Sequence, residues 1–144
     1  MSLANIFNIA GSAMSAQTIR LNTTASNMAN ADSVSSSVDQ TYRARKPVFE
    51  LQAPTQEQMT DIGTGLLPGQ GVNVTGIVES QAPLRTEYNP SHPLADEKGY
   101  VHYPNVNVVE EMADMISASR SFQINAEIMN TAKQMVQRAL TLGQ

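Results

Sequence analysis

Two histidines and an aspartate in one proline-rich stretch are the residues most able to do chemistry. His92 and His102 flank Asp96, and Glu97 lies beside it. Such side chains can ligate a metal ion or move a proton in hydrolysis, but they also cap backbone groups in turns. The segment 88–93 (YNPSHP) is typical of a turn, since two prolines so close together cannot lie in a helix. The turn interpretation is favoured, and we expect no catalytic residue, metal or cofactor.

The composition excludes several other classes of site. The 144 residues contain no cysteine, which excludes disulfides, thiolate nucleophiles and cysteine-ligated metal centres, and two histidines cannot form a three-histidine site. The formal net charge is -4, whereas a face that binds nucleic acid is basic. The Gly-Thr-Gly at 63–65 is followed by two leucines and Pro68, which breaks a dinucleotide-binding fingerprint. We therefore expect neither a nucleic acid nor a small-molecule substrate.

Two long apolar repeats organise the chain. The first predicts a helix over 3–31, about 43 Å long at a rise of about 1.5 Å per residue. Its apolar stripe repeats at alternating intervals of three and four residues, as in a coiled coil, and Arg20 is its only charged residue. The stripe consists of Phe7, Ala10, Met14, Gln17, Leu21, Thr24, Met28 and Ala31.

The second repeat predicts a helix over 107–142, about 54 Å long. Asn107 and Glu110 have the spacing of a capping box, and Pro104 lies just before them. The acidic residues that follow favour a helix N-terminus through the helix dipole. The main stripe consists of Val108, Met112, Met115, Ser119, Phe122, Ala126, Met129, Lys133, Val136 and Leu140.

The segment between the helices has a different character. Short runs of β-branched and aromatic residues alternate with serines, glycines and prolines, and Pro47 would place the first strand at a sheet edge. In order, we expect a loop at 32–39, a strand at 42–51, a connector at 63–71, a strand at 72–78, a turn at 88–93 and a short strand at 99–103.

These elements predict a mainly α protein with a small β insert. The long N- and C-terminal helices pack as an antiparallel, coiled-coil-like pair, and the insert, with short strands or a hairpin, lies at one end of the pair. We divide the chain into the N-terminal helix of the helical core (1–33), the β-rich insert with its glycine- and proline-rich loops (34–104) and the C-terminal helix of the core (105–144).

The C-terminal helix carries a second apolar stripe, about half a turn away from the first. It consists of Ile124, Ile128, Met135 and Leu142. A helix that is apolar on two sides is normally buried on both, and a two-helix pair covers only one. The β insert could fold back over the second stripe, or further copies of the chain and related partners could cover it. We favour the second interpretation.

We therefore predict an assembly interface along both helices. Arg120 could pair with an acidic side chain of a neighbour, and three asparagines could form hydrogen bonds across helix seams or simply lie at the surface. The predicted interface residues are Phe7, Met14, Leu21, Asn27, Met28, Asn30, Met112, Met115, Arg120, Phe122, Ile124, Asn125, Ile128, Met129, Met135 and Leu142.

Both ends of the chain resemble the bacterial flagellar rod and hook protein family. Residues 25–33 (ASNMANADS) are similar to the A-x-N-x-A-N segment that typically ends the first helix of that family, and 111–125 resemble its second terminal helix. The serines at 33–37 depart from the Thr-x-Gly that the family often has there. Further similarity to a proximal-rod member lies at 79–83, 89–96, 99–101, 104–106 and 140–144.

The resemblance implies a structural subunit of the proximal rod of the flagellar basal body, which polymerises through its terminal helices and transmits motor torque across the periplasm. The implied partners are further copies of the chain, the rod proteins FlgB, FlgF and FliE, the distal rod protein FlgG, and the flagellar type III export apparatus during transit. Arg20 is the first basic residue, so no charged segment precedes an apolar one. We therefore expect export without a cleaved signal peptide.

Two other classes of protein stay open. A coiled-coil adaptor or scaffold of a secretion system would share the helices but form a stable small oligomer. A peptidoglycan hydrolase would need a buried, positioned pair of carboxylates, and no apolar pattern of a pocket surrounds Glu79, Glu87, Asp96 or Glu97.

Overall fold

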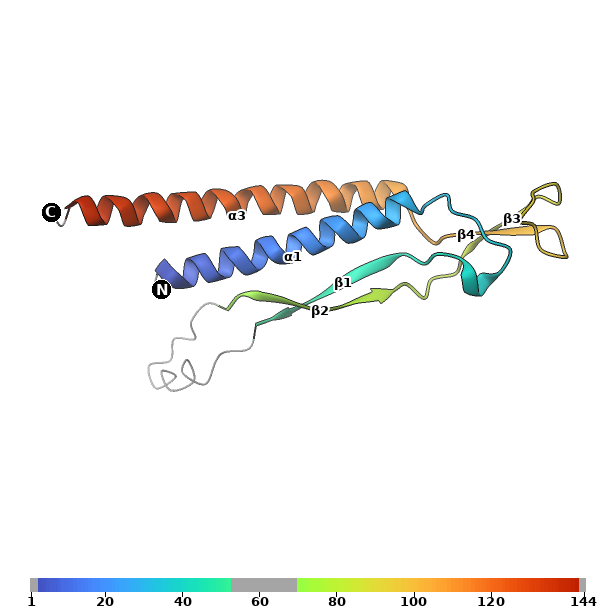
Figure 1. Cartoon of the computed structure of the whole chain (residues 1–144), viewed down its shortest axis with the longest axis horizontal. Helices are drawn as coiled ribbons and strands as arrows, with labels where there is room; N and C mark the ends of the chain where they lie inside the picture. Colours follow the sequence, from blue (N-terminus) through green and yellow to red (C-terminus); the bar gives the residue numbers. More distant parts are fainter. Residues whose placement is uncertain (1–2, 53–69, 143–144) are drawn as a thin grey trace.

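Two long helices that run side by side dominate the computed structural model, which describes residues 3–52 and 70–142 (Figure 1). Helix α1 (Leu3–Ala29) and helix α3 (Val108–Leu142) run in opposite directions, so both chain ends lie at the same end of the molecule. The mainly α fold with its antiparallel pair is confirmed. Because α3 has 35 residues and α1 has 27, α3 extends past the start of α1.

The start of α3 is capped as the sequence predicts. The side-chain oxygen of Asn107 accepts a hydrogen bond from the Val109 amide at 3.2 Å, and its backbone carbonyl accepts from the Glu111 amide at 2.9 Å. The other half of the predicted capping box differs, because the Glu110 carboxylate bonds to Lys46 of a strand. A tertiary ion pair here replaces the local contact.

The seam between the helices uses a register of α3 that is partly different from the predicted stripe. Met115, Phe122 and Met129 are half-buried, as expected, but the companion position is the residue before the predicted one. Ala118 is fully buried in place of the predicted Ser119, and Ala132 is buried in place of the predicted Lys133. Small methyl side chains allow the two helix backbones to approach closely, which explains the preference. Met112 and Leu140 of the predicted stripe are instead 51% and 67% exposed.

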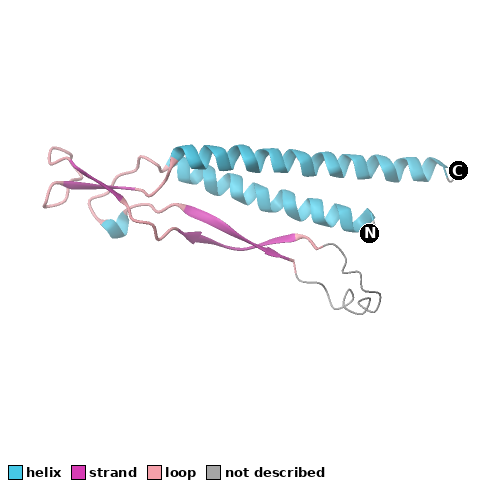
Figure 2. Ribbon diagram, turned by 180° about the vertical axis from the view of Figure 1, so that it is seen from behind, coloured by secondary structure: helices cyan, strands magenta, loops and turns pink. Residues whose placement is uncertain are grey.

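Strands β1 (Arg45–Leu51) and β2 (Val72–Glu79) form an antiparallel pair that lies along α1, on the side away from α3 (Figure 2). Arg45 pairs with Glu79 at one end and Leu51 with Val72 at the other. Pro47 lies in a two-stranded sheet, in which both strands are edges, as predicted. A bulge after Val48 shifts the register.

Strands β3 (Arg85–Tyr88) and β4 (Tyr100–Tyr103) form a second antiparallel pair beyond the end of the helices. Gly99 precedes β4 with a φ of 82°, a backbone conformation that favours glycine. The aromatic rings of Tyr88 and Tyr100 meet edge to face, with centroids 5.3 Å apart. The short strand predicted at 99–103 is therefore confirmed.

Strand β3 is missed by the sequence prediction, which has only loop and turn chemistry there. All four side chains of β3 are exposed, so no apolar alternation marks the strand.

The other segments of the insert differ in part from the prediction. The predicted loop at 32–39 ends in a short 3-10 helix, η1 (Val38–Gln40). The insert also lies differently from the prediction, because of its strands only β3 and β4 lie beyond the end of the helices, whereas β1 and β2 run back along α1. The predicted connector at 63–71 falls largely outside the described residues.

Candidate assembly surfaces

Charged side chains tie the start of α3 to both α1 and β1. Arg20 donates to Asp114 Oδ1 at 2.7 Å, and each side chain is 28% exposed. Lys46 Nζ donates to Glu110 Oε1 at 2.8 Å and lies 3.8 Å from Asp114 Oδ2. The hydrogen bond to Glu110 is the main cause that raises the pKa of the Lys46 ammonium, against the opposing effect of partial burial. These contacts position the first turns of α3.

We expect the Arg20–Asp114 pair to contribute about 1 kcal/mol to the free energy of unfolding, at the upper end for surface pairs, because water partly screens it. A double-mutant cycle with Arg20→Ala and Asp114→Ala, followed by urea unfolding, measures this coupling. The Arg45–Glu79 pair is the control, since its atoms are 3.0 Å apart but its side chains are 49% and 50% exposed. Equal coupling in the two pairs would contradict the expectation.

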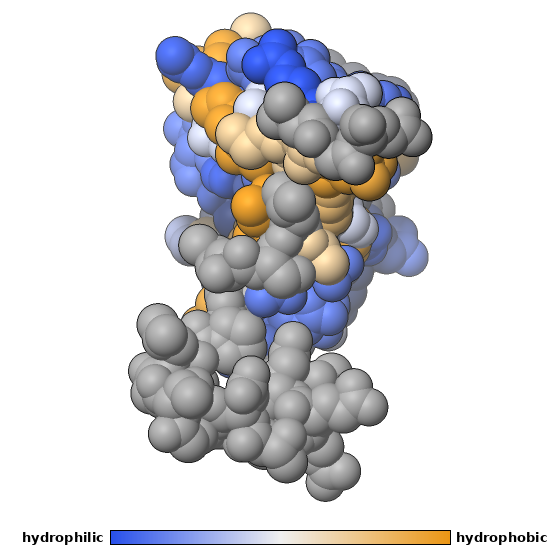
Figure 3. Space-filling view, turned by 90° about the vertical axis from the view of Figure 1, so that its left-hand side faces the viewer, coloured by the Kyte–Doolittle hydropathy of each residue, from blue (hydrophilic) through white to orange (hydrophobic). Residues whose placement is uncertain are grey.

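The second apolar stripe of α3 faces solvent in the isolated chain, as predicted. Ile124, Ile128 and Met135 are 51%, 43% and 59% exposed. They line a groove of about 360 Å³ together with Ile6 of α1. Figure 3 looks at the end of the molecule where the chain begins and ends, and apolar surface gathers there over the helices. The β1–β2 pair lies on the side of α1 away from α3, which agrees with the exposure of these side chains.

A further apolar set on α3 is distinct from the seam and from the second stripe. Val109, Met112 and Ile116 are 75%, 51% and 69% exposed. At about 100° per residue they lie on the side of α3 that faces away from Ala118. Their spacing of three and then four residues is a signal that the sequence contains, but Met112 was assigned to the stripe facing α1. Helix α3 therefore presents apolar side chains on two faces outside the α1 contact.

Asn27 of the predicted interface is buried inside the chain. It is 0% exposed, and its Nδ2 donates to the Arg45 carbonyl at 2.8 Å. Its Oδ1 accepts from the Arg45 amide and from the Tyr42 hydroxyl, both at 2.9 Å. The side chain thus joins α1 to the start of β1 within one subunit.

The other polar residues of the predicted interface make local contacts or stay exposed. Asn30 donates to the Ser26 carbonyl and Asn125 to the Ser121 carbonyl, both at 2.8 Å. These are bonds to the preceding helical turn, not bonds across a seam. Arg120 is exposed and forms no ion pair within 3–52 and 70–142. Of the remaining predicted residues, Phe7, Met14, Leu21, Met28, Met115, Phe122 and Met129 are half-buried, and the side chain of Leu142 lies outside the described residues.

His92 and Asp96 cap the turn that connects β3 to β4. His92 Nδ1 accepts from the Leu94 amide at 3.1 Å, and Asp96 Oδ1 accepts from the amides of Lys98 and Tyr100, both at 2.8 Å. The Tyr100 amide is the main cause that lowers the pKa of the Asp96 carboxyl. The capping interpretation is confirmed for these two residues. His102 Nε2 lies 4.0 Å from Asp96 Oδ2, too far for a hydrogen bond.

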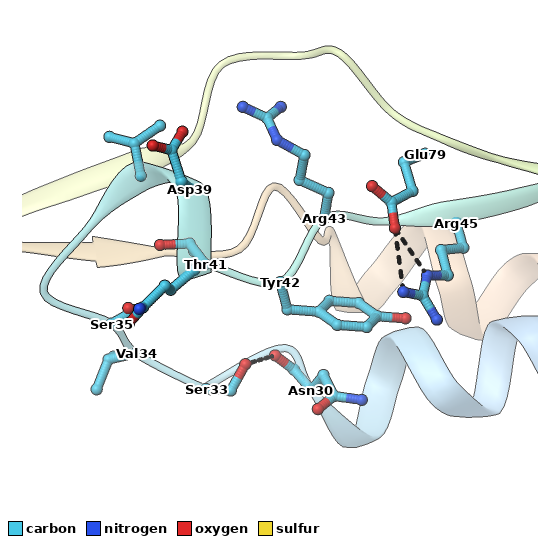
Figure 4. Close-up of a pocket in the computed structure, with 12 residues that line it drawn as sticks. Asn30, Ser33, Val34, Ser35, Asp39, Thr41, Tyr42, Arg43, Arg45 and Glu79 are labelled. Atoms are coloured by element: carbon cyan, nitrogen blue, oxygen red, sulfur yellow. Dashed lines mark hydrogen bonds and ion pairs between the residues drawn. The ribbon is translucent and has the colours of Figure 1, made fainter.

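A polar pocket of about 570 Å³ lies between the end of α1, the loop that follows it and the start of β1. Figure 4 shows the Tyr42 ring across this pocket, between Asn30 and the Arg45–Glu79 ion pair. Arg43 also lines it and donates to the carbonyls of Ser80 and Ala82. The charged groups that are paired here connect segments that are distant in the sequence. We therefore interpret the pocket as a structural contact between these segments. Across the described ranges, no three side chains of the metal-ligating types come together.

The class of protein follows from these features. His92 and Asp96 are engaged in capping a turn, and α3 exposes apolar faces that the described part of the chain does not cover. This is a structural subunit of an assembly. No described helix is both long and apolar enough to span a membrane.

Comparison with known proteins identifies the family. The family model described as flagella basal body rod protein matches residues 7–35, and the model of the flagellar basal body rod FlgEFG protein C-terminal region matches 97–142. Over all of both chains, the sequence is 52% identical to the flagellar basal-body rod protein FlgC of Escherichia coli O6:H1 and 54% identical to that of Yersinia enterocolitica. It is 36% identical to that of Borreliella burgdorferi, covering all of this chain and 99% of the relative. The chain belongs to the FlgC family of flagellar basal-body rod proteins, which are structural and not enzymes.

Proposed function

We propose that this rod protein forms part of the proximal rod, where its copies polymerise through the terminal helices into the shaft that transmits motor torque across the periplasm. The observation that carries the proposal is the apolar surface of α3, with Ile128 43% exposed and Ile116 69% exposed on different faces. Covering both faces requires neighbours on more than one side, as in a helical assembly.

The helix pair suits the transmission of torque. A long helix is stiff along its axis, and α1 and α3 are joined along their length and fixed by the Arg20–Asp114 ion pair. Load would pass through many parallel seams, so no single residue would act as a site in the enzymatic sense.

The partners that we propose are further copies of this chain, FlgB, FlgF and FliE, and FlgG toward the distal rod. The flagellar type III export apparatus would carry the chain to the assembly site without cleavage of a signal peptide. The two α3 faces, one around Ile128 and one around Ile116, give room for contacts with different neighbours. Arg120 and the other exposed members of the predicted interface would lie in these contacts.

Complementation tests the proposal. A Salmonella typhimurium strain without its own FlgC, which is 51% identical to this chain, should regain swimming when it expresses this chain. The chain should also co-purify with detergent-extracted basal bodies. Expression of the relative's own gene is the positive control. Accumulation of this chain in the cells without any in the purified basal bodies would contradict the proposal.

A further inference from the structure

The β1–β2 pair is held on α1 by polar contacts at its two ends and has little apolar anchoring. Six of the seven residues of β1 are exposed, with Pro47 half-buried. In β2 only Val72 and Val74 are half-buried. Such a small apolar contact stabilises the position of the pair weakly, so its placement depends on specific hydrogen bonds.

Asn27 supplies the hydrogen bonds at one end. Its amide pairs with both the N–H and the C=O of Arg45, at 2.9 and 2.8 Å, as an adjacent strand would do. The Tyr42 hydroxyl donates to the same oxygen at 2.9 Å, and the ring of Tyr42 borders the polar pocket of Figure 4. Because Asn27 is fully buried, removal of its side chain leaves the backbone groups of Arg45 without their protein partner, which costs free energy.

A second asparagine holds the same end from the other side. Asn105, just before α3, accepts from the Ala44 amide at 2.8 Å and donates to the carbonyls of Ala82 and Ser80, at 2.9 and 3.2 Å. The base of the β1–β2 pair is therefore clamped between α1 and the segment that leads into α3.

The far end of the pair touches α1 through Ser12. The Ser12 hydroxyl accepts from the Val72 amide at 3.1 Å, and a side chain at Gly71 would collide with Ser12. Helix α1 thus contacts the pair at residues 12 and 27, which lie on one face of the helix.

We infer that Asn27 is a positioning residue of assembly, because its hydrogen bonds hold the β1–β2 pair against α1. The exposed side chains of β2 and the apolar faces of α3 then contact neighbouring subunits in one fixed arrangement. The exposed side chains of β2 include Ile77 and Val78, each 53% exposed. The inference rests on the proposed role in the rod. The helix pair does not depend on the hydrogen bonds of Asn27, because the α1–α3 seam has its own contacts.

The test uses Asn27→Ala in the complemented strain and in purified protein. The helical circular dichroism should stay unchanged, while the exchange rates of the Arg45 and Val72 amides should rise by about ten- to a hundredfold. Swimming and recovery in basal bodies should fall. Asn105→Ala should reproduce both effects, and Tyr42→Phe, which removes one of the three bonds, should have a smaller effect.

A cysteine pair provides the rescue. The chain has no cysteine, so Ser12→Cys with Gly71→Cys creates a single possible disulfide, and a Cβ added at Gly71 would lie 3.1 Å from the Ser12 Cβ. This spacing is about 0.7 Å shorter than the mean in disulfides, and a small outward shift of the strand end corrects it. Added to Asn27→Ala, the disulfide should restore part of the swimming and part of the recovery in basal bodies.

Three results would overturn the inference. One is normal swimming and normal amide exchange in Asn27→Ala. Another is loss of the helical signal in Asn27→Ala, which would make Asn27 a general stability residue. The third is a disulfide that forms in the Asn27→Ala chain without any recovery in basal bodies, while the cysteine pair alone assembles normally. Failure of the unaltered chain to complement would refute the proposed function instead. Amide exchange would still decide whether Asn27 holds the β1–β2 pair on α1.

Discussion

Ile128→Asp should leave the helix pair folded and remove the chain from flagellar basal bodies. Ile128 is 43% exposed, so a carboxylate at this position stays hydrated in the isolated subunit and costs little there. In an assembly that buries the groove, the same carboxylate would lose its water without gaining a partner, at a cost of about 3 kcal/mol or more at each contact. A cost of that size lowers each contact's equilibrium constant by about a hundredfold.

The measurement combines swimming of a strain that carries Ile128→Asp with immunoblots of its purified basal bodies. Asn22→Asp is the matched control, because it places the same charge at an exposed polar position of α1, outside the groove and outside both exposed apolar faces of α3. Circular dichroism of the purified variant establishes that the helices persist. Swimming at the rate of the unaltered chain would rule out the groove as an assembly contact.

The long helices and their exposed stripe could be predicted because both are local properties of the sequence. A period of three and four residues defines a helix and its faces wherever the chain packs. The same holds for Asn107, whose role as a cap depends only on the residues that follow it. The exposure of Ile124 could be predicted because a pair of helices buries only one face of each, whereas α3 is apolar on more than one face.

The register of the seam could not be predicted from the same pattern. Hydropathy ranks Met112 above Ala118 as a core residue, but close approach of two backbones favours the smaller side chain. The choice between neighbouring faces depends on the partner helix, which the periodicity of α3 alone does not describe. For that reason Met112 was assigned to the seam and is found exposed.

The role of Asn27 depends on residues far along the chain. Its partners, Arg45 and Tyr42, follow it by more than a dozen residues and lie in a different element. An asparagine in a helix has the same local appearance whether it faces solvent or a strand edge. The exposed strand β3 also could not be predicted from the sequence. Its pairing with β4 involves backbone groups, and nearly every residue type has the same ones.

Ala118→Leu should destabilise the chain by about 1–3 kcal/mol, because the added carbons have no space in the seam. Ala118 is 0% exposed and lies where α3 meets α1. A leucine there would push the helices apart and weaken the contacts of the neighbouring seam residues. Urea unfolding of the purified protein, followed by circular dichroism, gives the change in the free energy of unfolding.

Two further variants make this a test of the register. Ala113→Leu adds the same side chain at an exposed position of α3 and should change the free energy of unfolding by less than about 0.5 kcal/mol. Ser119→Leu places it in the stripe that hydropathy alone selects. If the seam runs through Ala118, Ala118→Leu is the more harmful of the two; if Ser119→Leu is worse, α3 is rotated by one residue relative to the structure. The order of the two variants therefore separates packing by small side chains from packing by the apolar repeat.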